Sequence, residues 1–206
     1  MKKIILMAFV LLFSISIHSQ KKKVKSLKTN NIVLAKTDQL SAEINKNNFF
    51  LQLNNKDTIY LKTVDLKNVP TDCKIIPFKT NEINLYLITW IEKSSIKTNL
   101  KTEDIVDVYS RIYDIDLKKL IFSNIQITTN TTEIVFLDKL KNASETQQRI
   151  KREGFQFTLT PIGDILLKNK TQENRLSYNA IDKKYVDAKP AKTPVSTKTV
   201  VTKKKR

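Results

Sequence analysis

The chain has 206 residues, 28% of them charged, and a formal net charge of +17, so it is long enough for one domain with a buried core and is suited to anionic partners. The whole chain contains two glycines, one cysteine and one histidine, His18, which excludes glycine-rich phosphate loops and internal disulfides. If His18 leaves with a signal peptide, imidazole-dependent catalysis and ordinary zinc sites are excluded as well. We therefore expect no cofactor, no metal site and no catalytic residue.

A short apolar segment follows the basic start of the chain. Lys2 and Lys3 precede fourteen uncharged residues, Ile4 to Ile17. A helix that spans a bilayer needs about 20 apolar residues, so this run has the pattern of a cleavable export signal instead. We predict a signal peptide over residues 1–19, with no transmembrane segment after its cleavage. The protein would then be periplasmic, secreted or displayed at the cell surface.

A basic linker is predicted over residues 20–30, where Lys21, Lys22 and Lys23 begin a stretch with five lysines and no acid. The ending Ser-Gln before this lysine-rich start resembles the signal peptides of exported proteins from the Bacteroidota. This resemblance rests on the leader and the composition, and it implies no functional family.

Alternation of apolar and polar residues indicates strands in the middle of the chain. Residues 49–53 and 59–61 alternate with a period of two, which is typical of strands with one buried face. Residues 85–91 are apolar on both faces, which predicts a central strand covered on both sides, with Trp90 in the core.

Polar turns between further strand patterns predict two hairpins and a last short turn with an edge strand. They cover residues 105–127 with a turn at 116–119, residues 155–167 with a turn at 161–164, and residues 178–185. The apolar pattern stops near Val186. We therefore expect one β-rich domain over residues 31–186.

One segment of this domain, residues 142–153, has a helical pattern. Ser144 is followed three residues later by Gln147, which is the spacing of a capping box, and Gly154 stands where a helix could end. We predict a short surface helix near 142–153 within an otherwise all-β fold.

The strand spacing favours an antiparallel sandwich or an open barrel. The sequence of residues 61–65 is echoed at residues 100–104, which leaves a propeller-like repeat open as an alternative.

The densest acidic cluster lies around the first predicted hairpin. It consists of Glu103, Asp104, Asp107, Asp114 and Asp116. A pair of carboxylates suffices for glycoside hydrolysis, and carboxylate oxygens can bind calcium, although the spacing matches no EF-hand loop. A carboxylate-based hydrolase or a carbohydrate-binding domain is therefore one alternative function, and it requires two of these acids to converge in a cleft.

Most of the positive charge lies in the flanking segments. Residues 187–206 carry seven basic residues and one acid among prolines and small residues, which predicts a disordered tail, whereas residues 31–186 are nearly balanced. The expected polyanion contacts are Lys203, Lys204, Lys205 and Arg206, together with Lys21, Lys22 and Lys23.

These features favour a non-enzymatic binding or structural β-domain. Its basic tails would contact an anionic envelope surface, such as lipopolysaccharide or an acidic glycan, or a protein partner. Nucleic acid is not expected as a partner, because no base-reading motif is present. A subunit of an envelope assembly is a further alternative.

Overall fold

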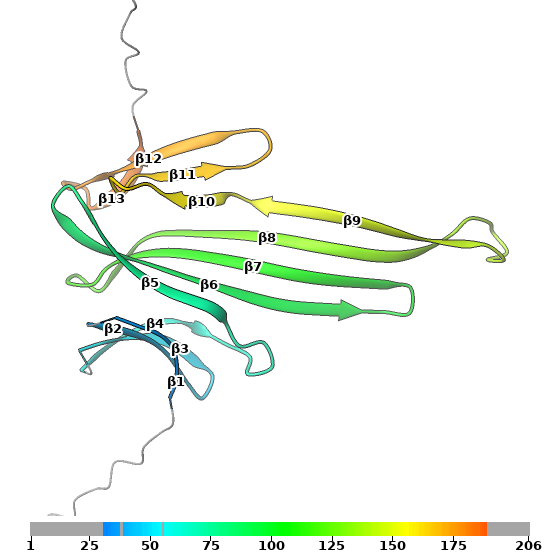
Figure 1. The fold of residues 1–206 in the computed structure, drawn as a ribbon, viewed down its shortest axis with the longest axis horizontal. Coiled ribbons are helices and arrows are strands. Elements are labelled where there is room, and N and C mark those ends of the chain that lie inside the picture. Colours follow the sequence, from blue (N-terminus) through cyan, green and yellow to red (C-terminus); the bar gives the residue numbers. More distant parts are fainter. Residues whose placement is uncertain (1–30, 38, 55, 189–206) are drawn as a thin grey trace, which may run out of the picture. The chain divides into compact units, whose positions relative to one another are not determined.

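The computed structural model describes residues 31–37, 39–54 and 56–188. These residues form thirteen strands, β1 to β13, in three antiparallel sheets, and no helix occurs among them (Figure 1). The expected all-β fold is therefore confirmed. The predicted signal peptide, the linker and the C-terminal tail lie outside the described residues, apart from the start of the tail at Asp187 and Ala188.

Sheet A is a meander of four strands: β1 (Ile32–Lys36), β2 (Leu40–Asn45), β3 (Asn48–Leu53) and β4 (Asp57–Thr63). The predicted alternation holds in β3, because Phe49, Leu51 and Leu53 are buried while the residues between them are more exposed. Alternating burial is expected where only one face of a sheet meets the core.

Sheet B contains the longest strands: β5 (Thr71–Thr80), β6 (Ile83–Lys97), β7 (Lys101–Asp114), β8 (Lys119–Phe136) and β9 (Ser144–Gly154). The hairpin predicted over residues 105–127 is formed by β7 and β8, with its turn after Asp114. Its second strand continues nine residues beyond the predicted end.

Sheet C is again a four-stranded meander: β10 (Gln156–Leu159), β11 (Ile165–Lys168), β12 (Glu173–Asn179) and β13 (Lys184–Asp187). The remaining predicted hairpin is confirmed here as β10–β11, and the turn and edge strand predicted over residues 178–185 are the end of β12, its turn and β13.

Two apolar cores join the sheets in layers, one on each face of sheet B. Strand β6 contributes to both: Ile88 and Trp90 pack with residues of sheet A, whereas Leu85 and Leu87 pack with residues of sheet C. All four side chains are buried, as predicted for a central strand covered on both sides.

Sheet B continues past the stretch covered by the other sheets (Figure 1). The end of β6 from Lys93 to Lys97 is exposed throughout, and so is every residue of β9. This part of sheet B, called the extension below, is a single layer whose polar side chains face solvent on both sides.

The helix predicted near residues 142–153 is wrong, because this segment forms β9. Each residue of β9 pairs with β8, from Ser144 opposite Phe136 to Gly154 opposite Gln126. The backbone pairing with β8 outweighs the weak helical pattern of an almost wholly polar segment. Gly154 has a φ of 76°, and it ends a strand instead of a helix.

Candidate anion-binding site

A pocket of about 490 Å³ lies where the chain passes from sheet B to sheet C. Its walls come from β8, from the β9–β10 junction and from the turn between β11 and β12. The lining residues are Gln126, Arg152, Gly154, Gln156, Lys168, Asn169 and Lys170. Three of these carry a positive charge, three carry a carboxamide and none is an acid. The lining therefore offers charge and hydrogen-bond donors suited to an anion.

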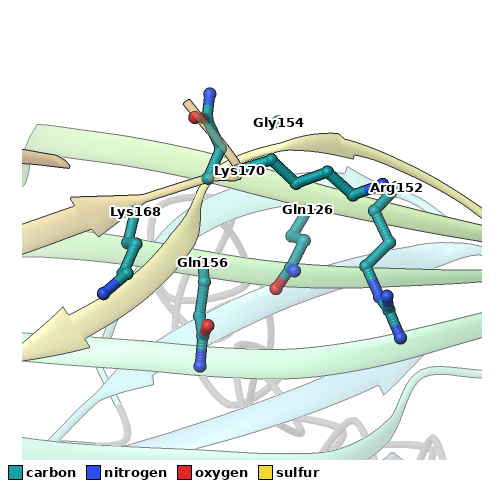
Figure 2. Close-up of a pocket in the computed structure, with 7 residues that line it drawn as sticks. Gln126, Arg152, Gly154, Gln156, Lys168 and Lys170 are labelled. Carbon is teal, nitrogen blue, oxygen red and sulfur yellow. The ribbon is translucent and has the colours of Figure 1, made fainter. Parts of the chain in front are cut away.

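The side chains of the pocket form an ordered row. Figure 2 shows Lys168, Gln156, Gln126 and Arg152 one after another, with the Lys170 side chain extended towards Arg152. Cations thus stand at both ends of the row and the amides stand between them. An anion in this pocket could be contacted both by these cations and by the carboxamides that line the pocket with them.

Gly154 shapes the junction that builds the pocket. Its φ of 76° lies in the left-handed region, and a Cβ atom added here would collide with the carbonyl oxygen of Ile125 in the neighbouring strand. On the other side of the junction, the Asn124 side-chain amide donates a hydrogen bond of 2.9 Å to the carbonyl oxygen of Phe155. These two features let the chain leave β9 close to β8 and enter β10 in the next sheet.

The turn between β11 and β12 is fixed by Asn169. Its Oδ1 atom accepts hydrogen bonds from the backbone N–H of Thr171 and of Gln172, each at 2.9 Å, and from the Thr171 hydroxyl at 3.1 Å. These bonds fix the turn that carries Asn169 and Lys170, two of the lining residues of the pocket.

The cations of the pocket are weakly neutralised. Lys168 Nζ lies 3.2 Å from Glu173 Oε2, but the two side chains are 65% and 55% exposed, and an exposed pair contributes only about 0 to 1 kcal/mol. Among the described residues, no carboxylate forms an ion pair with Arg152 or Lys170. A ligand anion therefore competes with one weak ion pair only.

The polyanion contacts predicted from the sequence, Lys21 to Lys23 and Lys203 to Arg206, lie outside the described residues. The pocket cations were not predicted, because the near balance of charge over residues 31–186 conceals a local cluster. The one sequence feature that indicated the cluster is the short spacing of Lys168 and Lys170. Arg152 is distant from them in the sequence, and only the fold brings it to the same pocket.

The structure does not gather the acidic cluster of the first hairpin into one cleft. Glu103 and Asp107 share the face of β7 that Tyr109 and Tyr113 occupy, which faces sheet A, whereas Asp114 lies on the opposite face. Four residues along a strand span about 13 Å, beyond the separations of glycosidase carboxylate pairs, which are about 5 to 9.5 Å.

Glu103 and Asp114 instead make local contacts. Glu103 pairs with Lys101 at 2.7 Å, and the hydrogen bond from Lys101 lowers the pKa of Glu103. Asp114 is buried and accepts a 3.0 Å hydrogen bond from the backbone N–H of Leu117 in the following turn, and Asp116 is exposed in that turn. No cluster of three potential metal ligands occurs among the described residues.

A second polar cluster joins sheet A to sheet B. Lys62 Nζ on β4 lies 2.9 and 2.8 Å from the two carboxylate oxygens of Glu92 and 3.5 Å from the Tyr109 hydroxyl. The Trp90 indole N–H donates a further bond of 2.8 Å to Glu92, and the rings of Trp90 and Tyr109 stack at 4.7 Å. Burial alone would lower the pKa of Lys62, but the hydrogen bond and charge of Glu92 outweigh it and raise this pKa.

Asp107 is the poorly satisfied member of this second cluster. It lies directly opposite Glu92 in the sheet, and its Oδ1 atom is buried without a hydrogen-bond partner among the described residues. Burial and the nearby charge of Glu92 raise the pKa of Asp107, and Lys62 offsets this only in part. Because Lys62 belongs to sheet A and its partners Glu92 and Tyr109 belong to sheet B, the cluster acts as a clamp between the two sheets.

Within the described residues, no helix is long and apolar enough to cross a membrane. Comparison with protein families, with curated proteins and with solved structures finds no match for this chain.

Proposed function

We propose that this chain is an exported, non-enzymatic β-protein that binds anionic groups of the cell envelope, the phosphates of lipopolysaccharide or the carboxylates of an acidic glycan. The observation that carries the proposal is the pocket at the junction of sheets B and C, whose charged lining residues, Arg152, Lys168 and Lys170, are all basic. Charge-assisted hydrogen bonds to such groups are about twice as strong as neutral ones.

The basic tails have a different part in this proposal. Their lysines attract polyanions without fixed geometry, at about 1 kcal/mol for each lysine near an anionic surface, and this attraction weakens with salt. The pocket supplies hydrogen-bond donors at fixed positions, including the carboxamides of Gln126 and Gln156. These fixed donors would favour one kind of anionic group over another. We infer that the tails raise the local concentration of the polymer and the pocket binds one of its groups.

The test uses the full chain and two probes, purified lipopolysaccharide and a uronic-acid oligosaccharide, in titrations at low and at high salt. A variant with Arg152, Lys168 and Lys170 changed to Gln loses the pocket charge. Its matched control, with Lys67, Lys74 and Lys79 changed to Gln, loses the same charge from exposed positions outside the pocket.

We expect the pocket variant to bind at least one of the probes about tenfold or more weakly than the control, since the pocket loses three charged donors. The probe that responds identifies the anionic group. A further variant with Lys203, Lys204, Lys205 and Arg206 changed to Gln should mainly reduce the salt dependence. Equal binding by the pocket variant and its control would refute the proposal.

A further inference from the structure

The extension of sheet B ends in two turns, of which the β8–β9 turn reaches farther (Figure 1). The β6–β7 turn spans residues 98–100, and the β8–β9 turn spans residues 137–143. The backbone N–H of Ile134, in β8, donates a 2.8 Å hydrogen bond to the carbonyl oxygen of Leu100, so the shorter turn is tied to β8 just before the longer turn begins. Both turns lie at the end of the extension away from sheets A and C (Figure 1). We call this end the distal tip.

Large apolar side chains gather on the distal tip. Leu137 is 62% exposed and Leu140 is 81% exposed in one turn, and Leu100 is 44% exposed in the other. Ile96 and Ile134, in the strands next to these turns, are also exposed. Ile96 shares a face of the sheet with Glu103 and Thr131, so Ile134 lies on the opposite face and the apolar end of the tip consists of the three leucines of the turns. Single exposed leucines are common, but three at one end of a sheet are suited to contact a partner.

The leucines of the longer turn are held outward by an ordered loop. The Asp138 carboxylate accepts hydrogen bonds of 3.0 Å from the backbone N–H groups of Asn142 and Ala143, and the backbone N–H of Leu137 donates one of 2.9 Å to the carbonyl oxygen of Ala143. The Lys141 ammonium lies 5.3 Å from the centre of the Phe136 ring. The exposure of Leu137 and Leu140 is therefore a property of the folded turn.

Basic residues surround this apolar patch. Lys97, Lys101, Lys139 and Lys141 lie in or next to the two turns, and Asp138 is the one acid within the turns. Lys101 is paired with Glu103, and the Asp138 carboxylate is engaged by its own loop. The remaining three lysines place positive charge around exposed leucines, which is the composition of a surface that lies on an anionic bilayer.

We propose that the distal tip docks on the surface of a bilayer with anionic headgroups. Leu137, Leu140 and Leu100 enter the boundary between headgroups and acyl chains, and the lysines contact the headgroups. This contact is separate from the pocket, so neither proposal depends on the other. Contact through the tip points the long axis of the extension towards the membrane and leaves the pocket, at the other end of the extension, free for a ligand.

The test measures binding of the full chain to vesicles made of equal parts phosphatidylcholine and phosphatidylglycerol. The double variant Leu137→Ser, Leu140→Ser should lower the partition coefficient about tenfold, because two largely exposed leucines can no longer be buried. The control Ile162→Ser, Ile181→Ser removes equally exposed apolar side chains from two turns of sheet C and should bind like the natural chain. Equal binding by both double variants would overturn the proposal.

A fluorescent variant separates contact of the tip from attraction by the tails or the pocket. The natural Trp90 is fully buried, so a tryptophan introduced by Leu140→Trp provides the added signal that responds to vesicles. We expect a blue shift of this signal on the anionic vesicles, a weaker one on pure phosphatidylcholine, and no loss of the shift when Arg152, Lys168 and Lys170 are changed to Gln.

Two other outcomes would overturn the proposal. Binding of the Leu140→Trp variant without a blue shift would mean that tails or pocket hold the vesicle and the tip stays in water. A blue shift that grows with protein concentration in the absence of vesicles would identify a second copy of the chain as the occupant.

Discussion

Replacing Gly154 by Ala tests whether the junction between sheets B and C has the geometry described above. The backbone at Gly154 is left-handed, with a φ of 76°, which costs an alanine about 1 kcal/mol. The new Cβ atom also collides with the carbonyl oxygen of Ile125, so the backbone must shift and weaken the pairing of Gly154 with Gln126. The shift and the weakened hydrogen bond add about 2 kcal/mol.

The expected loss in the free energy of unfolding is therefore about 3 kcal/mol, or about 6 to 12 °C in Tm for a domain of this size. Urea unfolding followed by the fluorescence of Trp90 measures it, because this side chain is buried between sheets A and B. The neighbouring control Glu153→Ala removes an exposed side chain and should change stability by less than about 0.5 kcal/mol.

A third variant separates the cost of the left-handed backbone from the cost of the collision with Ile125. Gly154→Asn adds the same Cβ atom, but asparagine tolerates the left-handed region better than alanine. It should recover about 1 kcal/mol of the loss and no more, because the collision with Ile125 remains. A loss below about 0.5 kcal/mol for Gly154→Ala, or full recovery by Gly154→Asn, would refute the proposed collision.

Three further predictions concern the clamp between sheets A and B and the single thiol. Lys62→Met should lower stability by about 2 kcal/mol, between the values for exposed and buried ion pairs, and a double-mutant cycle with Glu92→Gln should assign most of this loss to the pair. Asp107→Asn should raise stability by about 1 kcal/mol near pH 7. The pKa of Asp107 is raised by folding, so the folded state binds its proton more tightly and the stability of the natural chain falls as pH rises through this pKa. Below about pH 4 Asp107 is protonated, so the stability gained by Asp107→Asn should vanish there in urea titrations. A gain in stability that persists below this pH would contradict a buried, charged Asp107 as its cause. Burial raises the pKa of the Cys73 thiol to about 12, so alkylation by iodoacetamide should be far slower in the folded chain than in urea, and equal rates would contradict this burial.

Most strands could be predicted where burial leaves a pattern in the sequence. The segment around Trp90 is apolar on both faces because sheets A and C cover both faces of β6. Strand β9 could not be predicted, since all of its residues are exposed and no apolar period marks it. Its conformation comes from backbone pairing with β8, and Gly154, which resembled a helix end, instead permits the passage between sheets.

The pocket could not be predicted for a related reason. Arg152 belongs to the end of one sheet, whereas Lys168 and Lys170 belong to a turn of the next, and only the meander brings them together. Sequence reasoning located positive charge in the flanking segments, where it is continuous along the chain. A charge cluster that forms only in the folded chain leaves no continuous run of basic residues in the sequence.

The basic residues of β9 could serve to protect an open sheet edge or to bind an anion. Their ion pairs help to distinguish these two roles. An open edge strand needs charged side chains to prevent pairing with another sheet, and Arg149, Lys151 and Arg152 meet this need. Arg149 pairs with Glu133, and Lys151 pairs with Glu153, so each of these two has an exposed ion-pair partner within the sheet. Arg152 has no such partner among the described residues and lines the pocket instead. Protection of the edge is a sufficient reason for the first two cations, and the proposed anion site supplies a reason for the third.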